Sequence, residues 1–159
     1  MLEIKQVTSE EQINLTRELF MEYAKYLDFD LNFQNFEEEL KTLPGDYSPP
    51  DGCVLLAFYN DNLAGCVGLR KFKDDICEMK RLYVRPKFRK KRIGRALSDA
   101  VINQALKIGY NCMRLDTIPH MKVAIALYLS LGFKEIKPYR YNPIEGAKFF
   151  ELKLSLKSA

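Results

Sequence analysis

The sequence contains little histidine, no paired-cysteine motif and no long apolar segment. His120 is the single histidine, which excludes zincins, zinc fingers and two-histidine iron centres. The four cysteines form no C-x-x-C pair, and three lie in apolar, strand-like stretches typical of reduced, buried thiols. The longest apolar run, 53–59, is far shorter than the roughly 20 residues of a membrane-spanning helix. These absences predict a cytoplasmic protein with no metal and no membrane partner.

The charge is distributed unevenly along a chain of single-domain size. At 159 residues, 47% of them hydrophobic, we expect one domain over 1–159. Acidic residues recur through the first 30 positions, so we expect no secretory signal there. The net charge of +4 combines nine cations and one anion in 78–95 with eleven acids and four bases in 1–46. The basic segment suits a solvated face, a nucleic-acid patch or an anion site, and composition leaves these alternatives open.

Hydrophobic periodicity predicts an α/β protein with a mixed, mostly antiparallel central sheet in the order β-α-α-β-β-β-α-β-α-β-β. Alternating or continuous apolar stretches predict strands over 2–7, 53–59, 63–72, 76–84, 112–116, 133–136 and 147–154. Helical spacing and capping signals predict helices over 9–27, 33–43, 93–108 and 119–131.

Residues 81–97 combine the end of a strand, a basic loop and the start of a helix. The first N–H groups of a helix have no intrahelical partner, and the helix dipole places partial positive charge there. Phosphate is a natural ligand of such a terminus. Gly94 lets a ligand approach the backbone, and the flanking cations neutralise its charge. The segment therefore predicts a phosphate site.

Two motifs resemble one known family. The sequence RKKRIG at 89–94 resembles the R/Q-x-x-G-x-G/A pyrophosphate loop of the GNAT superfamily of N-acetyltransferases, and AIALYLSLGF at 124–133 resembles its A-x-x-L-Y-x-x-x-G-F helix. The expected element order also agrees with this family over 2–154. Two positions depart from the pattern. Arg92 stands where the loop usually has its first glycine, and Met121 stands where many members carry an asparagine that touches the cofactor.

The resemblance implies an acetyl-CoA-dependent N-acetyltransferase that moves the acetyl group directly from the thioester to a primary amine of a small molecule or amino compound. Acetyl-CoA would be a co-substrate, and no metal is implied. The pantetheine arm would pair with the strand before the loop, and the pyrophosphate would lie over the loop. The implied cofactor-binding residues are Leu82, Tyr83, Val84, Arg89, Lys90, Lys91, Arg92, Ile93, Gly94, Arg95 and Ala96.

Two residues are implied to carry the chemistry. An ammonium group has no lone pair for attack, so the acceptor amine must first lose a proton. Glu78 matches a common general-base position of the family, and its cationic neighbours favour proton removal through a water molecule. Tyr128 matches the tyrosine that protonates the leaving CoA thiolate. The plainer interpretations, a salt-bridging strand carboxylate and a core tyrosine, stay open.

The acceptor site is implied to lie between the first two helices and the last hairpin. Tyr26, Asp28 and Tyr141 are the candidate substrate residues, and the further candidates for the cleft wall are Asp30, Tyr47, Tyr139 and Arg140. The acidic N-terminal region favours a cationic amine, whereas Arg140 suits a carboxylate, so an amino acid also fits. One alternative is a non-catalytic acyl-CoA sensor. Another is a nucleic-acid-binding module that uses 80–95, which the acidic N-terminal region disfavours. We expect a small-molecule amine and no nucleic acid as partner, with a homodimer left open.

The loop hypothesis has a direct test. Gly94→Glu should abolish acetyl-CoA binding and leave the fold intact, because it places a carboxylate against the pyrophosphate. Calorimetric titration with acetyl-CoA measures the loss. Retained affinity in this variant would show that the phosphates bind elsewhere.

Overall fold

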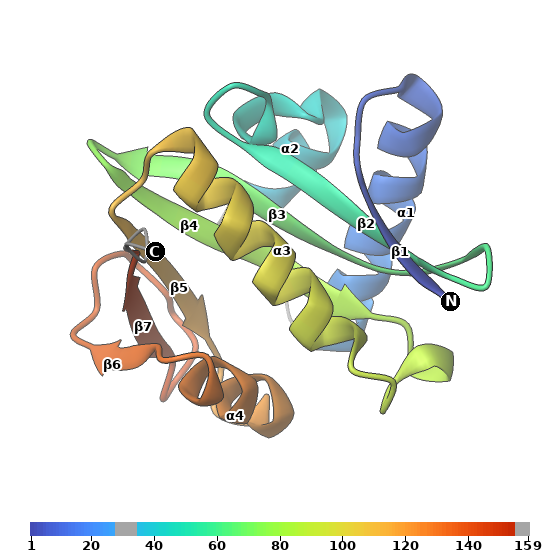
Figure 1. Cartoon of the computed structure of the whole chain (residues 1–159). Coiled ribbons are helices and arrows are strands. Elements are labelled where there is room, and N and C mark those ends of the chain that lie inside the picture. The colour runs from blue at the N-terminus through green and yellow to red at the C-terminus, as the bar shows by residue number, and fades with distance from the viewer. Residues whose placement is uncertain (28–34, 155–159) are drawn as a thin grey trace, which may run out of the picture.

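The computed structural model describes residues 1–27 and 35–154, and a sheet of seven strands forms its centre (Figure 1). Within the described residues, neighbouring strands are antiparallel except for the parallel pair β4 and β5. The strands follow one another across the sheet as β1 (Leu2–Gln6), β2 (Cys53–Tyr59), β3 (Asn62–Lys73), β4 (Ile76–Val84), β5 (Cys112–Thr117), β7 (Lys148–Lys153) and β6 (Lys134–Ile136).

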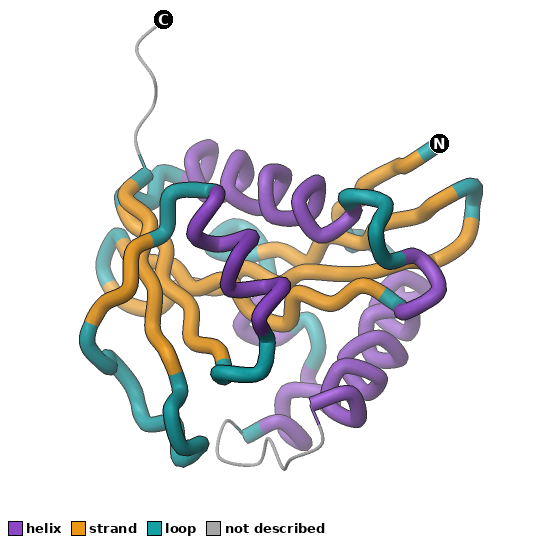
Figure 2. The backbone as a smooth tube through the Cα atoms, turned by 90° about the horizontal axis from the view of Figure 1, so that it is seen from below, coloured by secondary structure: helices purple, strands orange, loops and turns teal. Residues whose placement is uncertain are grey.

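Helices cover both faces of the sheet, as the edge-on view in Figure 2 shows. One face packs against α3 and α4, whose apolar residues share a core with β3, β4 and β5. The other face packs against α1 and α2 in a second apolar cluster. None of the described helices is long and apolar enough to cross a membrane. The helices are α1 (Glu10–Leu27), α2 (Phe36–Thr42), α3 (Ile93–Ile108) and α4 (Lys122–Ser130).

The predicted order of strands and helices is confirmed, with differences at the ends of elements. The helix expected from position 119 begins at Lys122, because Ile118 accepts a turn hydrogen bond from the Met121 N–H before the helix starts. The helix expected over 33–43 is described from Phe36, and its first expected residues lie outside the described part. Helix termini are the least well defined part of a periodicity pattern. Short 3₁₀ turns at Gly45–Tyr47 and Pro86–Phe88 were not expected.

Strand β4 leaves its partner β5 halfway along its length. The two strands pair only where Ile76–Glu78 lies opposite Cys112–Arg114. On its other edge β4 stays paired to β3, but the register shifts between Lys80 and Tyr83, so that β4 carries one extra residue. Arg81 lies in this bulge with a left-handed φ of 60°. A bulge bends a strand and re-aims its side chains, so β4 and β5 diverge beyond Glu78.

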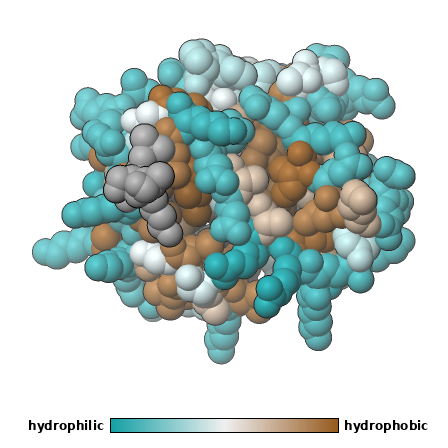
Figure 3. Space-filling view, in the orientation of Figure 1, coloured by the Kyte–Doolittle hydropathy of each residue, from teal (hydrophilic) through white to brown (hydrophobic). Residues whose placement is uncertain are grey.

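The surface over α3 is largely polar. Figure 3 shows hydrophilic side chains over most of this face, with apolar side chains in smaller areas between them. The segment between β4 and α3 contributes exposed cations to this surface, at Lys87, Lys90, Lys91, Arg92 and Arg95.

Candidate active site

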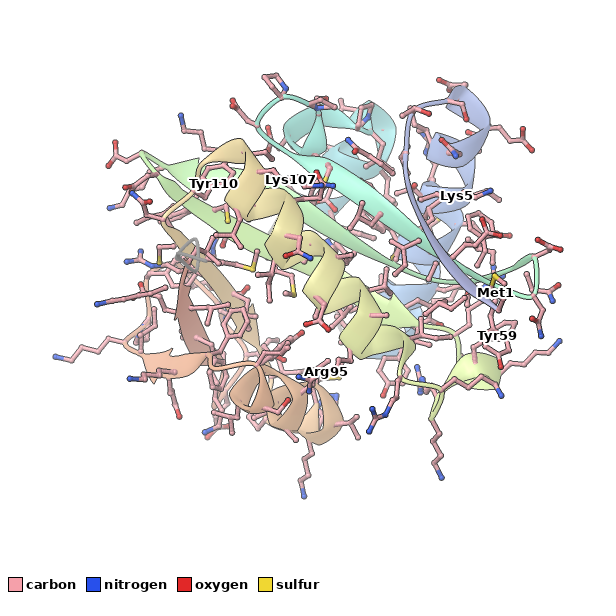
Figure 4. All side chains as sticks on the ribbon, in the orientation of Figure 1. Met1, Lys5, Tyr59, Arg95, Lys107 and Tyr110 are labelled. Carbon is pink, nitrogen blue, oxygen red and sulfur yellow. The ribbon has the colours of Figure 1, made fainter. Side chains whose placement is uncertain are left out.

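The basic loop leads into the N-terminus of α3. The helix begins at Ile93, and no side chain caps its first turn by a hydrogen bond. Unsatisfied N–H groups, the helix dipole and the exposed loop cations all favour an anion at this point. Arg95 lies on this first turn and donates a hydrogen bond of 3.2 Å to the Ser130 hydroxyl of α4. Figure 4 labels Arg95 beside α4. The loop and α4 are therefore joined at the predicted pyrophosphate site.

Two loop residues adopt backbone conformations that glycine favours. Arg92 has a φ of 62° and Lys90 a φ of 67°. The family's loop usually has a glycine at the position of Arg92, and the structure reaches the same left-handed conformation with an arginine, at a cost of about 1–2 kcal/mol. At Gly94, by contrast, an added Cβ would make only ordinary contacts, 3.7 Å from Leu127 and 3.9 Å from Val84. Gly94→Ala is therefore a matched control for Gly94→Glu.

The strand before the loop has one edge that β5 does not cover. Leu82, Tyr83 and Val84 lie beyond the last paired residue, Glu78, and face the diverging β5. The carbonyl oxygen of Val84 accepts a hydrogen bond of 3.0 Å from Arg89 Nε. A strand edge with unpaired N–H and C=O groups is a natural site for an extended amide-bearing chain. This geometry suits the predicted pantetheine contact.

Much of the charge in the basic segment is neutralised within the protein. Arg85 makes ion pairs with Glu18 at 3.0 Å and Glu22 at 2.7 Å, both on α1. Arg81 pairs with Glu39 on α2 at 2.9 Å. Acids of the N-terminal region therefore bind cations of β4 and the residue that follows it. Fewer of them remain to attract a cationic acceptor than the sequence suggests.

Lys80 and Asp116 form a buried ion pair between the diverging strands. Lys80 Nζ lies 3.3 Å from Asp116 Oδ1, and the side chains are 4% and 2% exposed. Burial, only partly offset by Asp116, lowers the pKa of Lys80 to about 8. Burial acts to raise the pKa of Asp116, but Lys80 and a hydrogen bond from Asn142 outweigh it and lower that pKa. The sequence analysis did not identify Asp116. The one feature that could have indicated it is an acidic residue at the end of an otherwise apolar strand.

Tyr128, the predicted proton donor, is a buried residue of α4. It is 7% exposed and packs its ring near Phe133 and Phe150 at centroid distances of 5.7 and 6.4 Å. Burial raises the pKa of Tyr128, and Tyr23 of α1 and Asp116 of β5 raise it further. The hydroxyl is therefore protonated at physiological pH and close to the gap between β4 and β5.

Glu78 is buried among positive and polar groups. Its side chain is fully buried, and its oxygens accept hydrogen bonds from Arg70 Nε at 3.0 Å, Tyr139 Oη at 2.8 Å and Arg140 Nη2 at 3.0 Å. Arg140 Nε lies 2.9 Å from the second oxygen. These donors hold the carboxylate in place and occupy the lone pairs with which a base takes a proton. Tyr139 and Arg140 were expected from the sequence near the acceptor, whereas Arg70 was not.

A cleft of about 590 Å³ opens beside Glu78. It lies between α2 with its following 3₁₀ turn and the end of β3, and Arg140 forms part of its wall. Of the candidate acceptor residues, Tyr47 and Arg140 line it, whereas Tyr26 and Tyr141 do not. Tyr26 lies on α1 with the Arg89 guanidinium 4.5 Å above its ring, and Tyr141 is 73% exposed beside Arg140. Asp28 and Asp30 lie outside the described residues.

The diverging strands and the basic helix terminus define a class of enzyme that binds a phosphate-bearing cofactor across the end of a split sheet. The chain matches the Acetyltransferase (GNAT) family over residues 13–133. It therefore belongs to this family, and it is an acetyltransferase. Across the described residues, no cluster of three or more histidine, cysteine or acidic side chains could hold a metal.

Relatives and solved structures agree with this assignment. The chain is 34% identical to an uncharacterised N-acetyltransferase of Dictyostelium discoideum, over 97% of this chain and 99% of the relative. It is 40% identical to an uncharacterised N-acetyltransferase of Schizosaccharomyces pombe, over 86% and 85% of the two chains. The PaiA N-acetyltransferase of Thermoplasma acidophilum, solved in complex with coenzyme A, has a TM-score of 0.74 at 22% identity, over 96% of this chain and 99% of that one.

The Lys80–Asp116 pair predicts a pH-dependent loss of stability. Asp116→Asn should lower the free energy of unfolding by about 3–5 kcal/mol near pH 6, because it leaves a buried ammonium without its counterion. The folded pKa of Lys80, about 8, lies below that of an unfolded lysine, so Lys80 sheds its proton in both proteins as the pH rises past 8. The deficit should therefore be smaller at pH 9. Denaturant unfolding at the two pH values measures it.

A double variant provides the control for this prediction. Lys80→Met combined with Asp116→Asn should be more stable than Asp116→Asn alone, since the unpaired charge is gone. An equal deficit at both pH values would contradict the pairing.

Proposed function

We propose that this protein is an acetyl-CoA-dependent N-acetyltransferase that transfers the acetyl group directly to a primary amine of a small molecule or amino compound. The observation that carries the proposal is the gap between β4 and β5 beside an uncapped, basic helix N-terminus. The proposal takes 1–159 as one cytoplasmic domain with no metal, nucleic-acid or membrane partner, and it leaves a homodimer open.

The cofactor would run from the loop into the gap. The pyrophosphate would accept hydrogen bonds from the first-turn N–H groups of α3, with the loop residues 89–96 around it. The pantetheine arm would pair with the free edge of Leu82–Val84, which directs the thioester toward Lys80 and Asp116. A backbone N–H near Tyr83 or Val84 would polarise the thioester carbonyl. The acceptor would enter from the cleft on the other side, beside Glu78.

The reaction needs one base and one acid. The neutral amine nitrogen attacks the thioester carbon, the C–S bond breaks, and the CoA thiolate takes a proton. Tyr128 suits the acid role, since burial raises its pKa and keeps the hydroxyl protonated. Glu78 remains the proposed base and would act through a water molecule, because its oxygens are already hydrogen-bonded. Asp116, with a lowered pKa, is a second carboxylate close to the thioester path.

One observation favours the alternative of a non-catalytic acyl-CoA sensor. A carboxylate that accepts several hydrogen bonds is a poor base, and Glu78 fits the role of a structural anchor for two arginines. A sensor would bind acetyl-CoA but release no CoA thiol with any amine. Binding and thiol release must therefore be measured separately.

Tyr128→Phe tests the proposed chemistry. It should leave acetyl-CoA affinity unchanged and lower kcat by about 10²–10⁴, because the ring packing stays and only the proton donor is lost. Thiol release with a panel of amino acids, polyamines, aminoglycosides and peptide N-termini measures kcat, and calorimetry measures affinity. Glu78→Gln is the parallel variant for the base.

Three results would separate the hypotheses. Absence of any heat with millimolar acetyl-CoA would rule out the proposed function. A sensor would bind acetyl-CoA without thiol release across the panel. Tyr128→Phe and Glu78→Gln would then bind acetyl-CoA as the wild type does. Turnover that Tyr128→Phe leaves intact would reject Tyr128 as the acid.

A further inference from the structure

Two arginines meet a buried carboxylate at the wall of the cleft beside Glu78. The cleft lining as a whole is not cationic, because it includes Glu38, Glu39 and Asp46 as well as Glu78. On one side of it, however, Arg70 and Arg140 both bind Glu78, and their side chains are only 12% and 24% exposed. Largely buried guanidinium groups favour acceptors for all of their N–H donors, so this side of the cleft favours an additional anionic group.

The two arginines on the cleft wall have hydrogen-bonding capacity to spare. A guanidinium has five N–H donors. Toward Glu78, Arg70 donates through Nε and Arg140 through Nη2, and within the described part of the chain these are their only hydrogen bonds. Arg140 is also held in place, with its guanidinium 5.6 Å from the centroid of the Phe72 ring. A fixed guanidinium with free donors is the group that binds a carboxylate in bidentate fashion.

A buried hydroxyl adds a third donor. Tyr47 lines the cleft, is 1% exposed, and its ring lies over Gly68 of β3. Its hydroxyl has no hydrogen-bond partner among the described residues. Burial, with the nearby Glu39 carboxylate, raises the pKa of Tyr47, so the hydroxyl keeps its proton and can donate it. Buried hydroxyls without a partner are rare in proteins and point to a ligand that completes them.

We propose that this side of the cleft binds a carboxylate of the acceptor, so that the acceptor is an amino acid or another small molecule with both a primary amine and a carboxylate. The inference rests on the proposed function, since it assigns the acceptor of that reaction. The carboxylate would bind Arg70, Arg140 and the Tyr47 hydroxyl, and the amine would face the gap between β4 and β5. An amine without a carboxylate, such as a polyamine, would leave these three donors without an acceptor and bind less well.

Matched pairs of acceptors test the charge requirement. Each amino acid is compared with the amide of the same carboxylate: glycine with glycinamide, alanine with alaninamide, β-alanine with β-alaninamide, and 4-aminobutyrate with its amide. At least one carboxylate member should have a kcat/KM ten or more times that of its partner in the thiol-release assay. The different spacings between amine and carboxylate also show which length fits the cleft.

Tyr47→Phe tests the site itself. The variant removes only a hydroxyl without a protein partner, so the protein should fold as before, and kcat/KM for the preferred carboxylate acceptor should fall about tenfold, mainly through KM. Carboxylate-free amines should be unaffected. Arg140→Gln should cause a larger loss. Tyr110→Phe is the matched control, because it removes another buried tyrosine hydroxyl at the opposite end of α3 from the loop (Figure 4), where it bonds to the Asp51 carbonyl.

Failure of this inference is distinguishable from failure of the proposed function. Equal or faster acetylation of polyamines and amides than of every amino acid would overturn the carboxylate site and leave the acetyltransferase intact. If no acceptor leads to release of the CoA thiol, the carboxylate site is tested by binding alone. The same amino acids are then titrated calorimetrically into the protein saturated with CoA. Binding that Tyr47→Phe weakens would support the carboxylate site without catalysis, and no binding of any amino acid would overturn it.

Discussion

The separation of β4 from β5 beyond Glu78 is the constraint on which the rest of the structure depends. A strand in the middle of a sheet normally uses both edges, yet β4 is paired on both sides only at its start. The bulge at Arg81 lets β4 stay on β3 while it leaves β5. The free edge is followed along the chain by the basic loop, which leads into the N-terminus of α3.

Long-range ion pairs hold the helices that enclose this gap. Arg85 binds α1 through Glu18 and Glu22, and Arg81 binds α2 through Glu39. The acidic N-terminal segment and the basic central segment are therefore partners in the folded protein. The exposed cations of the basic segment lie before and at the start of α3, where a pyrophosphate would bind.

The site contains two carboxylates in different surroundings. Asp116 pairs with a buried lysine in the gap, whereas Glu78 is held by two arginines and a tyrosine beside the cleft. In the proposed reaction, Asp116 would lie close to the thioester. Glu78, the proposed base, would lie beside the acceptor.

The sequence by itself determined the order of elements and the family, and it located the basic segment before α3. These depend on local signals: apolar periodicity, a helix start after basic residues, and the motif around Tyr128. It also indicated Glu78 and Tyr128, although not their surroundings.

Only the tertiary structure decided which charges are paired and what lines the cleft. Arg70, Glu39 and Tyr47 come from three separate segments, and no local pattern shows that they meet. The role of Asp116 could not be predicted from local sequence either, because its partners are Lys80 on another strand and Asn142 on a loop. Burial and ionisation are properties of neighbours brought together by folding. For that reason a short stretch of sequence indicated the basic helix start, and only the fold showed which side chains share the cleft.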